Sequence, residues 1–239
     1  MCEGVRMTEQ EILAAYEDNF KAIDASIAGF DNALDKYAFK STLKHSLVLG
    51  LAQRLLEFSR GSEAMGRAGL AAANAAMGRM CLETLFKLKA LCLDAVSPQD
   101  YVEQEKVAQY QSIRRALGLP NVSQVFTDEE QAKYRTELQE TERELGVRVK
   151  KHEIKLSEWA KRAGEERTYA LSYSALSDYV HTGVSSLVHM MEVREQGQVF
   201  IQTGPSTHQL ASLLEGVCIY LALATEAIDH MFANELLNE

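Results

Sequence analysis

The chain has 239 residues, of which 46% are hydrophobic, and its formal net charge is −9. A chain of this length can bury a full hydrophobic core, and we expect one helical domain over residues 1–239. The acidic balance argues against broad nonspecific binding to nucleic acid or to anionic membranes, although it leaves room for a local basic pocket.

The spacing of the cysteines and the hydropathy of the chain indicate the cellular compartment of the protein. The four cysteines form no C-x-x-C pair. Cys81 and Cys92 would lie about 16 Å apart along one helix, too far for a disulfide, so we expect reduced thiols and a cytoplasmic protein. The N-terminus lacks a hydrophobic signal core. Charges interrupt both of the most apolar segments before the ~20 apolar residues of a membrane span, so we expect no membrane insertion.

The first third of the chain has two amphipathic helices. Thr8 to Glu11 form a capping box, and the helix that follows should end near Gly29. A second helix should begin in residues 35–39 and stop at Gly61. His45 lies among the polar positions of this helix, and we interpret it as a structural histidine at the surface or half-buried.

The most apolar long segment is residues 64–96, rich in Ala, Leu and Met, and it ends where Ser97-Pro98 prevents further helix. We predict a central, mostly buried helix. Arg79, Glu83 and Lys87 recur every four residues on one narrow face of it. Burying a charged side chain is costly unless it is paired. The three residues therefore either pair with polar groups of a neighbouring helix or form the floor of a functional site.

Downstream segments complete the predicted architecture. Residues 98–117 should form a helix, and a second capping box at residues 127–130 opens a charged helical arm or insertion over 127–167. An apolar stripe begins at Thr168, a small β-hairpin or ordered loop should lie within 193–202, and a last long helix should run to about Leu236. The fold class is therefore all-α, a multi-helix bundle.

Two polar segments are the candidates for chemistry. The sequence contains no P-loop, dinucleotide-binding, zincin or nucleophile-elbow motif. If two helices pack side by side, their polar faces bring together a candidate site that comprises Arg79, Glu83, Tyr173, Ser177 and His181. A histidine can exchange protons near neutral pH, and an arginine can hold a phosphate. The alternative is a buried polar network that only fixes helix register.

Two sequence segments, GRMCLETLFKL and ALSDYVHTG, are similar to those of a known protein family. They resemble the blocks of an uncharacterised bacterial all-helical family with R-x-x-x-E and Y-x-x-x-S-x-x-x-H motifs, across about Met65 to His189. That family resembles, more distantly, the HEPN superfamily, many of whose members are metal-independent ribonucleases of toxin and phage-defence systems. Those enzymes usually carry an arginine shortly before the histidine, whereas this chain has Ala175, Leu176 and Ser177 there, so Arg79 would supply the guanidinium.

The resemblance implies specific roles and partners. His181 would be the general acid or base, Arg79 would stabilise the phosphorane charge, and Glu83 would orient one of them. Tyr173 and Ser177 would bind substrate RNA, no metal or cofactor would be needed, and the protein would be a homodimer. The competing hypothesis is a non-enzymatic helical module that binds a protein partner through the charged arm or the last helix.

Overall fold

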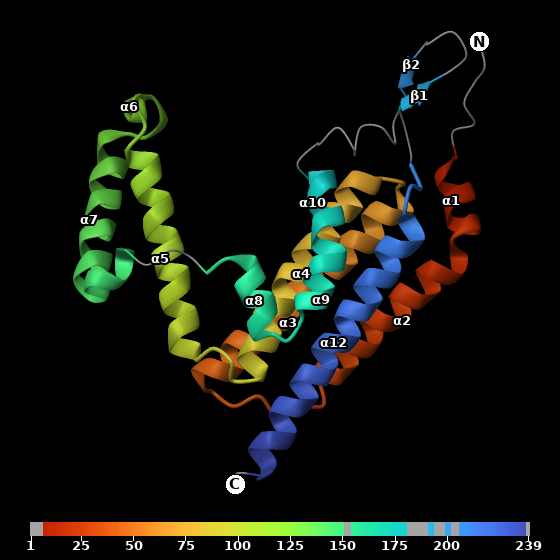
Figure 1. Ribbon diagram of the computed structural model, residues 1–239, viewed down its shortest axis with the longest axis horizontal. Coiled ribbons are helices and arrows are strands. Elements are labelled where there is room, and N and C mark those ends of the chain that lie inside the picture. The colour runs from red at the N-terminus through yellow and green to blue at the C-terminus, as the bar shows by residue number, and fades with distance from the viewer. Residues whose placement is uncertain (1–6, 151–153, 181–190, 194–198, 202–205, 238–239) are drawn as a thin grey trace. The chain divides into compact units, whose positions relative to one another are not determined.

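A computed structural model describes residues 7–150, 154–180, 191–193, 199–201 and 206–237 (Figure 1). It confirms the all-α, multi-helix prediction. The chain forms two compact units, one of residues 1–95 with 159–239 and the other of residues 96–158. In chain order the elements are α1 (Glu9–Ala15), α2 (Glu17–Leu34), α3 (Leu43–Arg67), α4 (Ala71–Cys92), α5 (Pro98–Leu117), α6 (Val122–Val125), α7 (Asp128–Leu145), η1 (Gly146–Lys150), α8 (Leu156–Arg162), α9 (Glu166–Thr168), η2 (Tyr169–Tyr173), α10 (Ser174–Val180), β1 (Met191–Val193), β2 (Val199–Ile201) and α12 (Leu210–Leu237).

The first capping box is confirmed, but the helix boundaries that follow it differ from the prediction. The Thr8 hydroxyl accepts from the Glu11 amide at 3.3 Å, and the Glu11 carboxylate accepts from the Thr8 amide at 2.6 Å. The expected single helix is divided at Tyr16, whose φ of −118° and ψ of 25° are not helical. Its second part, α2, continues past the exposed Gly29 to Leu34.

The predicted central helix over residues 64–96 is wrong at its start. Residues 64–67 are the last turn of α3, which also passes through Gly61, and α4 begins only at Ala71. Gly69 ends α3 with a φ of +67°. The Leu70 amide donates to the Met65 carbonyl at 2.9 Å and the Gly69 amide to the Gly66 carbonyl at 3.0 Å. These two bonds are a Schellman motif, in which glycine accommodates the left-handed turn.

The other end of α4 closes in the same way without glycine. Asp94 has a φ of +53°, and the Ala95 amide donates to the Ala90 carbonyl at 3.0 Å. Aspartate tolerates this left-handed conformation better than most residues do. The Asp94 carboxylate also forms an ion pair with Lys44 of α3, with 2.6 Å between Oδ1 of Asp94 and Nζ of Lys44. The end of α4 is thereby tied to the start of α3.

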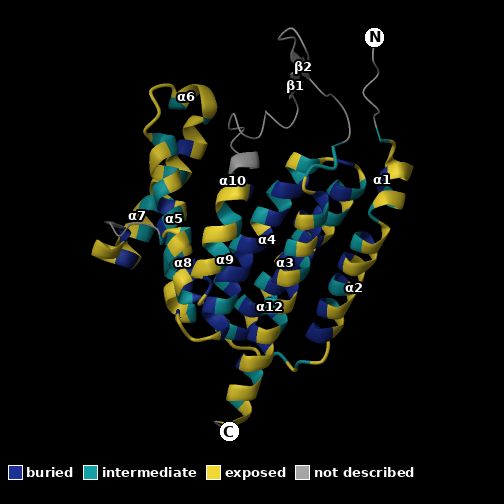
Figure 2. Ribbon diagram, turned by 45° about the vertical axis from the view of Figure 1, so that its right-hand side comes forward, coloured by how far each residue is buried: buried dark blue, intermediate teal, exposed yellow. Residues whose placement is uncertain are grey.

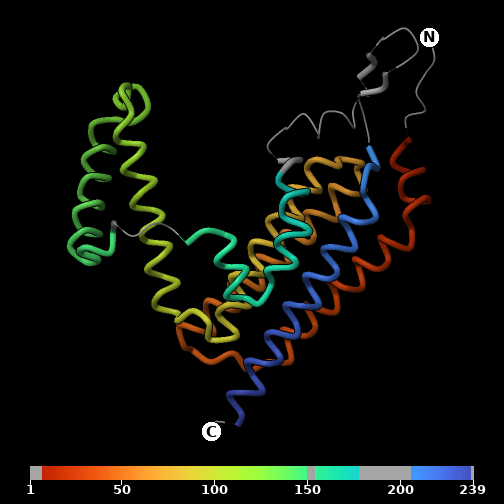
Figure 3. Tube along the Cα trace, viewed as in Figure 1, coloured from red at the N-terminus to blue at the C-terminus, as the bar shows by residue number. Residues whose placement is uncertain are grey.

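The core of the first unit surrounds α4. This helix packs against α3, α10 and α12, while α12 also packs against α2 and α3 (Figure 3). Figure 2 shows buried residues along α4 and on the inner faces of α3 and α12. Among the largest fully buried side chains are Leu82, Leu85, Phe86, Leu88 and Leu91, all on α4. Their burial supplies much of the hydrophobic stabilisation of this unit.

The last helix, α12, is long and apolar enough by length and composition to cross a membrane, with a mean hydropathy of 1.5 over its most apolar window. The structure buries 44% of that window against the rest of the protein. A core helix of a soluble protein passes the same test. The absence of membrane insertion therefore stays a prediction.

The second unit is built on the α5–α7 pair. Val107 and Tyr110 of α5 pack with Leu145 and Val149 in a small hydrophobic cluster. The second capping box is confirmed, since Thr127 and Glu130 exchange both bonds at the start of α7. This unit spans residues 96–158, so it joins α5 to the larger part of the charged segment predicted at 127–167, whereas residues 159–167 belong to the first unit. The assignment of residues 1–239 to one domain stays a prediction.

The strands β1 and β2 pair antiparallel, with Glu192 opposite Phe200. Residues 194–198 between them lie outside the described residues. The hairpin or ordered loop expected over residues 193–202 therefore stays a prediction.

Helical glycines provide a test of this packing. A Cβ built on Gly50 of α3 meets none of the described residues within 4 Å, whereas one on Gly66 lies 3.0 Å from Cδ1 of Leu210. Gly50→Ala should therefore raise the free energy of unfolding by about 0.5–1 kcal/mol, because alanine loses less backbone entropy in a helix. Gly66→Ala should lower it by about 1 kcal/mol or more through overpacking. Urea unfolding measures both, and equal effects of the two substitutions would contradict the packing described.

Candidate functional site

Arg79 lies on the polar strip of α4, at the edge of its buried surface. Its Nε donates to Oε1 of Glu83, one turn along the same helix, at 2.8 Å. The Arg79 side chain is 19% exposed and that of Glu83 is 37% exposed. The guanidinium is thus held by a carboxylate and still reaches the surface.

The second partner of Arg79 comes from a distant part of the chain. Its Nη2 donates to the hydroxyl of Tyr173 at 2.8 Å, and its Cζ lies 4.9 Å from the centre of the Tyr173 ring. Tyr173 ends η2, a π-helical turn. Such turns are rare and occur frequently at functional sites. The hydrogen bond and the cation–π contact fix the plane of the guanidinium.

Two further contacts align η2 and its neighbours along α4. The ring of Tyr169 stacks on that of Tyr173, with centroids 4.9 Å apart, and packs against Phe86 at 6.3 Å. Beyond them Lys89 pairs with Glu165, which also accepts from the hydroxyl of Thr168. The chain therefore runs antiparallel to α4 from residue 165 to residue 173, and polar contacts alternate with aromatic ones.

A backbone motif places Glu165 in this arrangement. Gly164 has a φ of +70°, and the Glu165 amide donates to the Ala160 carbonyl at 2.7 Å. This Schellman turn ends α8 and directs the following residues along α4. The left-handed turn at Gly164 is the reason that Glu165 meets Lys89.

The structure brings together three of the five predicted site residues: Arg79, Glu83 and Tyr173. Ser177 is half-buried on α10, one turn beyond Tyr173. His181 directly follows Val180, the last residue of α10, and lies outside the described residues. The adjacency of Arg79 and His181 accordingly stays a prediction.

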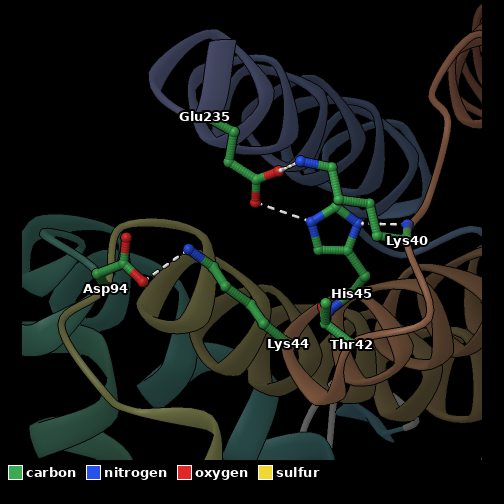
Figure 4. Close-up of polar contacts among 6 residues, drawn as sticks. All are labelled: Lys40, Thr42, Lys44, His45, Asp94 and Glu235. Carbon is green, nitrogen blue, oxygen red and sulfur yellow. Dashed lines mark hydrogen bonds and ion pairs between the residues drawn. The ribbon is translucent and has the colours of Figure 1, made fainter. Parts of the chain in front are cut away.

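A polar cluster that the sequence analysis missed surrounds His45. The prediction of a surface or half-buried histidine is wrong, because the His45 side chain is only 2% exposed. The backbone amide of Lys40 donates to its Nδ1 at 2.8 Å, so the ring proton resides on Nε2. Nε2 donates in turn to Oε1 of Glu235 at 2.8 Å, near the end of α12 (Figure 4).

Aromatic and charged groups enclose this histidine. The rings of Phe39 and Phe232 meet its ring edge to face, at 5.8 and 5.3 Å. Lys40 Nζ lies 3.4 Å from Oε2 of Glu235. Burial alone would raise the pKa of Glu235, but the His45 hydrogen bond and the Lys40 charge outweigh it and lower that pKa. The cluster is a structural clamp that joins α12 to the start of α3.

A neighbouring pair extends the clamp. Tyr37 stacks on Phe232 at 4.6 Å, and its hydroxyl donates to Asp229. Burial, together with the Asp229 carboxylate, raises the pKa of Tyr37 to about 12. The only local signal for this cluster was Thr42, whose hydroxyl accepts from the His45 amide at 3.3 Å and caps α3. Glu235 lies 190 positions away, so no short motif links it to His45.

These features define the class of protein: an all-α protein whose central helix carries an Arg-Glu-Tyr polar strip. The chain belongs to a family of unknown function, DUF5677, whose model matches residues 45–198. The match includes α4, η2, α10 and every predicted site residue. Searches of curated proteins and of solved structures each found no match to the chain.

The clamp generates a stability prediction. His45→Ala leaves a cavity and removes the acceptor of the Lys40 amide, so it should lower the free energy of unfolding by about 2–4 kcal/mol. His230→Ala is the matched control, because His230 is exposed on α12 and its ring hydrogen-bonds to the nearby Asn234 of the same helix. It should change stability by less than about 0.5 kcal/mol. Similar losses in the two variants, measured by urea unfolding, would rule out the clamp.

Proposed function

We propose that this protein is a HEPN-like, metal-independent ribonuclease of a bacterial toxin or phage-defence system. The single observation that carries the proposal is the arrangement of Arg79. Glu83 and Tyr173 hold its guanidinium in a defined plane, and part of it stays exposed. A guanidinium fixed before substrate binds is a suitable group for a phosphate.

The reaction in this proposal is a transesterification of RNA. The 2′-hydroxyl attacks the adjacent phosphorus, the bond to the 5′-oxygen of the next nucleotide breaks, and a 2′,3′-cyclic phosphate forms. His181 accepts the proton of the nucleophile or donates one to the leaving oxygen. Arg79 stabilises the negative charge on the phosphorane, and Glu83 orients Arg79. Tyr173 and Ser177 bind the RNA.

The surroundings of the strip support RNA as the ligand. The stacked rings of Tyr169 and Tyr173 are half-buried beside Arg79, and Lys161 and Arg167 are exposed on the neighbouring α8 and α9. Aromatic platforms with nearby basic residues are a common means of binding single-stranded RNA. A homodimer in the cytoplasm would place two such strips in one particle.

A non-enzymatic helical interaction module is the second candidate, and one observation favours it. Two nitrogens of Arg79 already bond to groups of the same chain, Glu83 and Tyr173. Tyr173 and Val180 are about 10 Å apart along a helix axis, which is more than a single phosphate spans. In this function the strip fixes the register of α4 and η2, and the protein acts through a protein partner.

Cleavage of structured and single-stranded RNA in the presence of a chelator tests the first candidate. His181→Ala should reduce the rate by about 10²–10⁴-fold through loss of acid–base catalysis. Arg79→Ala should reduce it by about 10²–10³-fold through loss of charge stabilisation. Two exposed residues provide matched controls, His230→Ala and Arg54→Ala, and both should leave the rate unchanged.

The outcome also separates the two candidates. Equal cleavage by the wild type and His181→Ala, or no cleavage by either, would exclude the ribonuclease. The interaction module predicts that Arg79→Ala lowers the melting temperature while no RNA is cleaved at all. Circular dichroism of each variant establishes that lost activity is not lost folding.

A further inference from the structure

A pocket of about 180 Å³ lies on the first unit, and its lining includes neither Arg79 nor Tyr173. Its lining residues come from α4, η2, α10 and α12 together with Gln209. Of these elements, α10 and α12 both pack on α4 (Figure 1). Its floor is buried and includes Gly78, Leu176 and Tyr220. Its rim includes the exposed Leu171 and Ser212. The pocket is therefore a pit with a sealed base and an opening at the surface.

Two glycines keep this pit open without being needed for helix packing. A Cβ on Gly216 of α12 would lie 3.6 Å from the hydroxyl oxygen of Tyr220, and one on Gly78 of α4 would lie 3.6 Å from Cδ2 of Leu176. Both distances are ordinary contacts, so alanine fits at either position. Gly66 differs, since a Cβ there would be 3.0 Å from Leu210. Glycine destabilises a helix interior relative to alanine, and at Gly78 and Gly216 close packing does not explain it.

The chemistry of the lining selects an uncharged ligand. Tyr220 lines the pocket and is only 5% exposed, and Ser172 and Ser212 are polar residues of the same lining. Burial raises the pKa of Tyr220, so the phenol keeps its proton and can donate it. None of the described residues that line the pocket carries a charge. A charged ligand would lose its hydration without gaining an ion pair.

We propose that this pocket binds a neutral, single-ring compound that carries a hydrogen-bond acceptor for Tyr220. The size supports the class of ligand, since an engineered cavity of about 150 Å³ in another protein holds one benzene molecule. The ring packs between Leu171 and Leu176, and its acceptor meets the hydroxyl of Tyr220 beside Gly216. This site is independent of the ribonuclease proposal.

Phenol is the probe, and benzoate is its charged counterpart of similar size. Titration calorimetry or ligand-observed NMR on the full chain should show phenol binding, with benzoate at least tenfold weaker. Gly216→Ala places a methyl group where the acceptor must lie, and it should weaken phenol at least tenfold. Tyr220→Phe should weaken phenol while leaving the pocket in place.

Gly50→Ala is the matched control, because it adds the same methyl group to a helix interior where none of the described residues lies within 4 Å. Both alanine variants should melt about 1–4 °C above the wild type. Gly50→Ala should bind phenol as the wild type does. No binding of phenol to the wild type, equal affinity in Gly216→Ala, or benzoate binding as tightly as phenol would each overturn the proposal.

Discussion

The burial of α4 is the constraint on which the rest of the structure depends. Three other helices cover it, so nearly all of its surface must be apolar, and charged groups are confined to a narrow strip. At the edge of that buried surface the guanidinium of Arg79 needs polar partners to satisfy it, because an unpaired charge there would be costly. Glu83 does so from within the helix and Tyr173 from outside it. The polar strip thereby determines where η2 lies.

A second constraint acts at the opposite end of the long helices. The backbone amide of Lys40 can only donate, so it fixes the tautomer of His45 and leaves Nε2 as a donor to Glu235. The end of α12 is therefore held by the His45 hydrogen bond and the Lys40 ion pair to a carboxylate whose pKa is lowered, rather than by apolar contact alone.

Much of the architecture was predictable because local rules determine it. Both capping boxes, the start of α5 at Pro98 and the extent of α12 follow from the residues within one turn of each helix end. The break at Gly69 was missed because the surrounding alanines favour helix, and one left-handed residue decides the outcome. The predicted convergence of Arg79, Glu83 and Tyr173 could be read from helical spacing. The His45 clamp could not, since its partners lie at opposite ends of the chain.

The position of η2 on α4 depends most directly on the contact between Arg79 and Tyr173, which joins parts of the chain 94 positions apart. A double-mutant cycle with Arg79→Gln and Tyr173→Phe, followed by urea unfolding, measures the energy of that contact. We predict a coupling of about 1–3 kcal/mol, as for a hydrogen bond to a charged group. A coupling near zero would show that the two residues stabilise the fold independently, and it would contradict the polar strip as the element that positions η2.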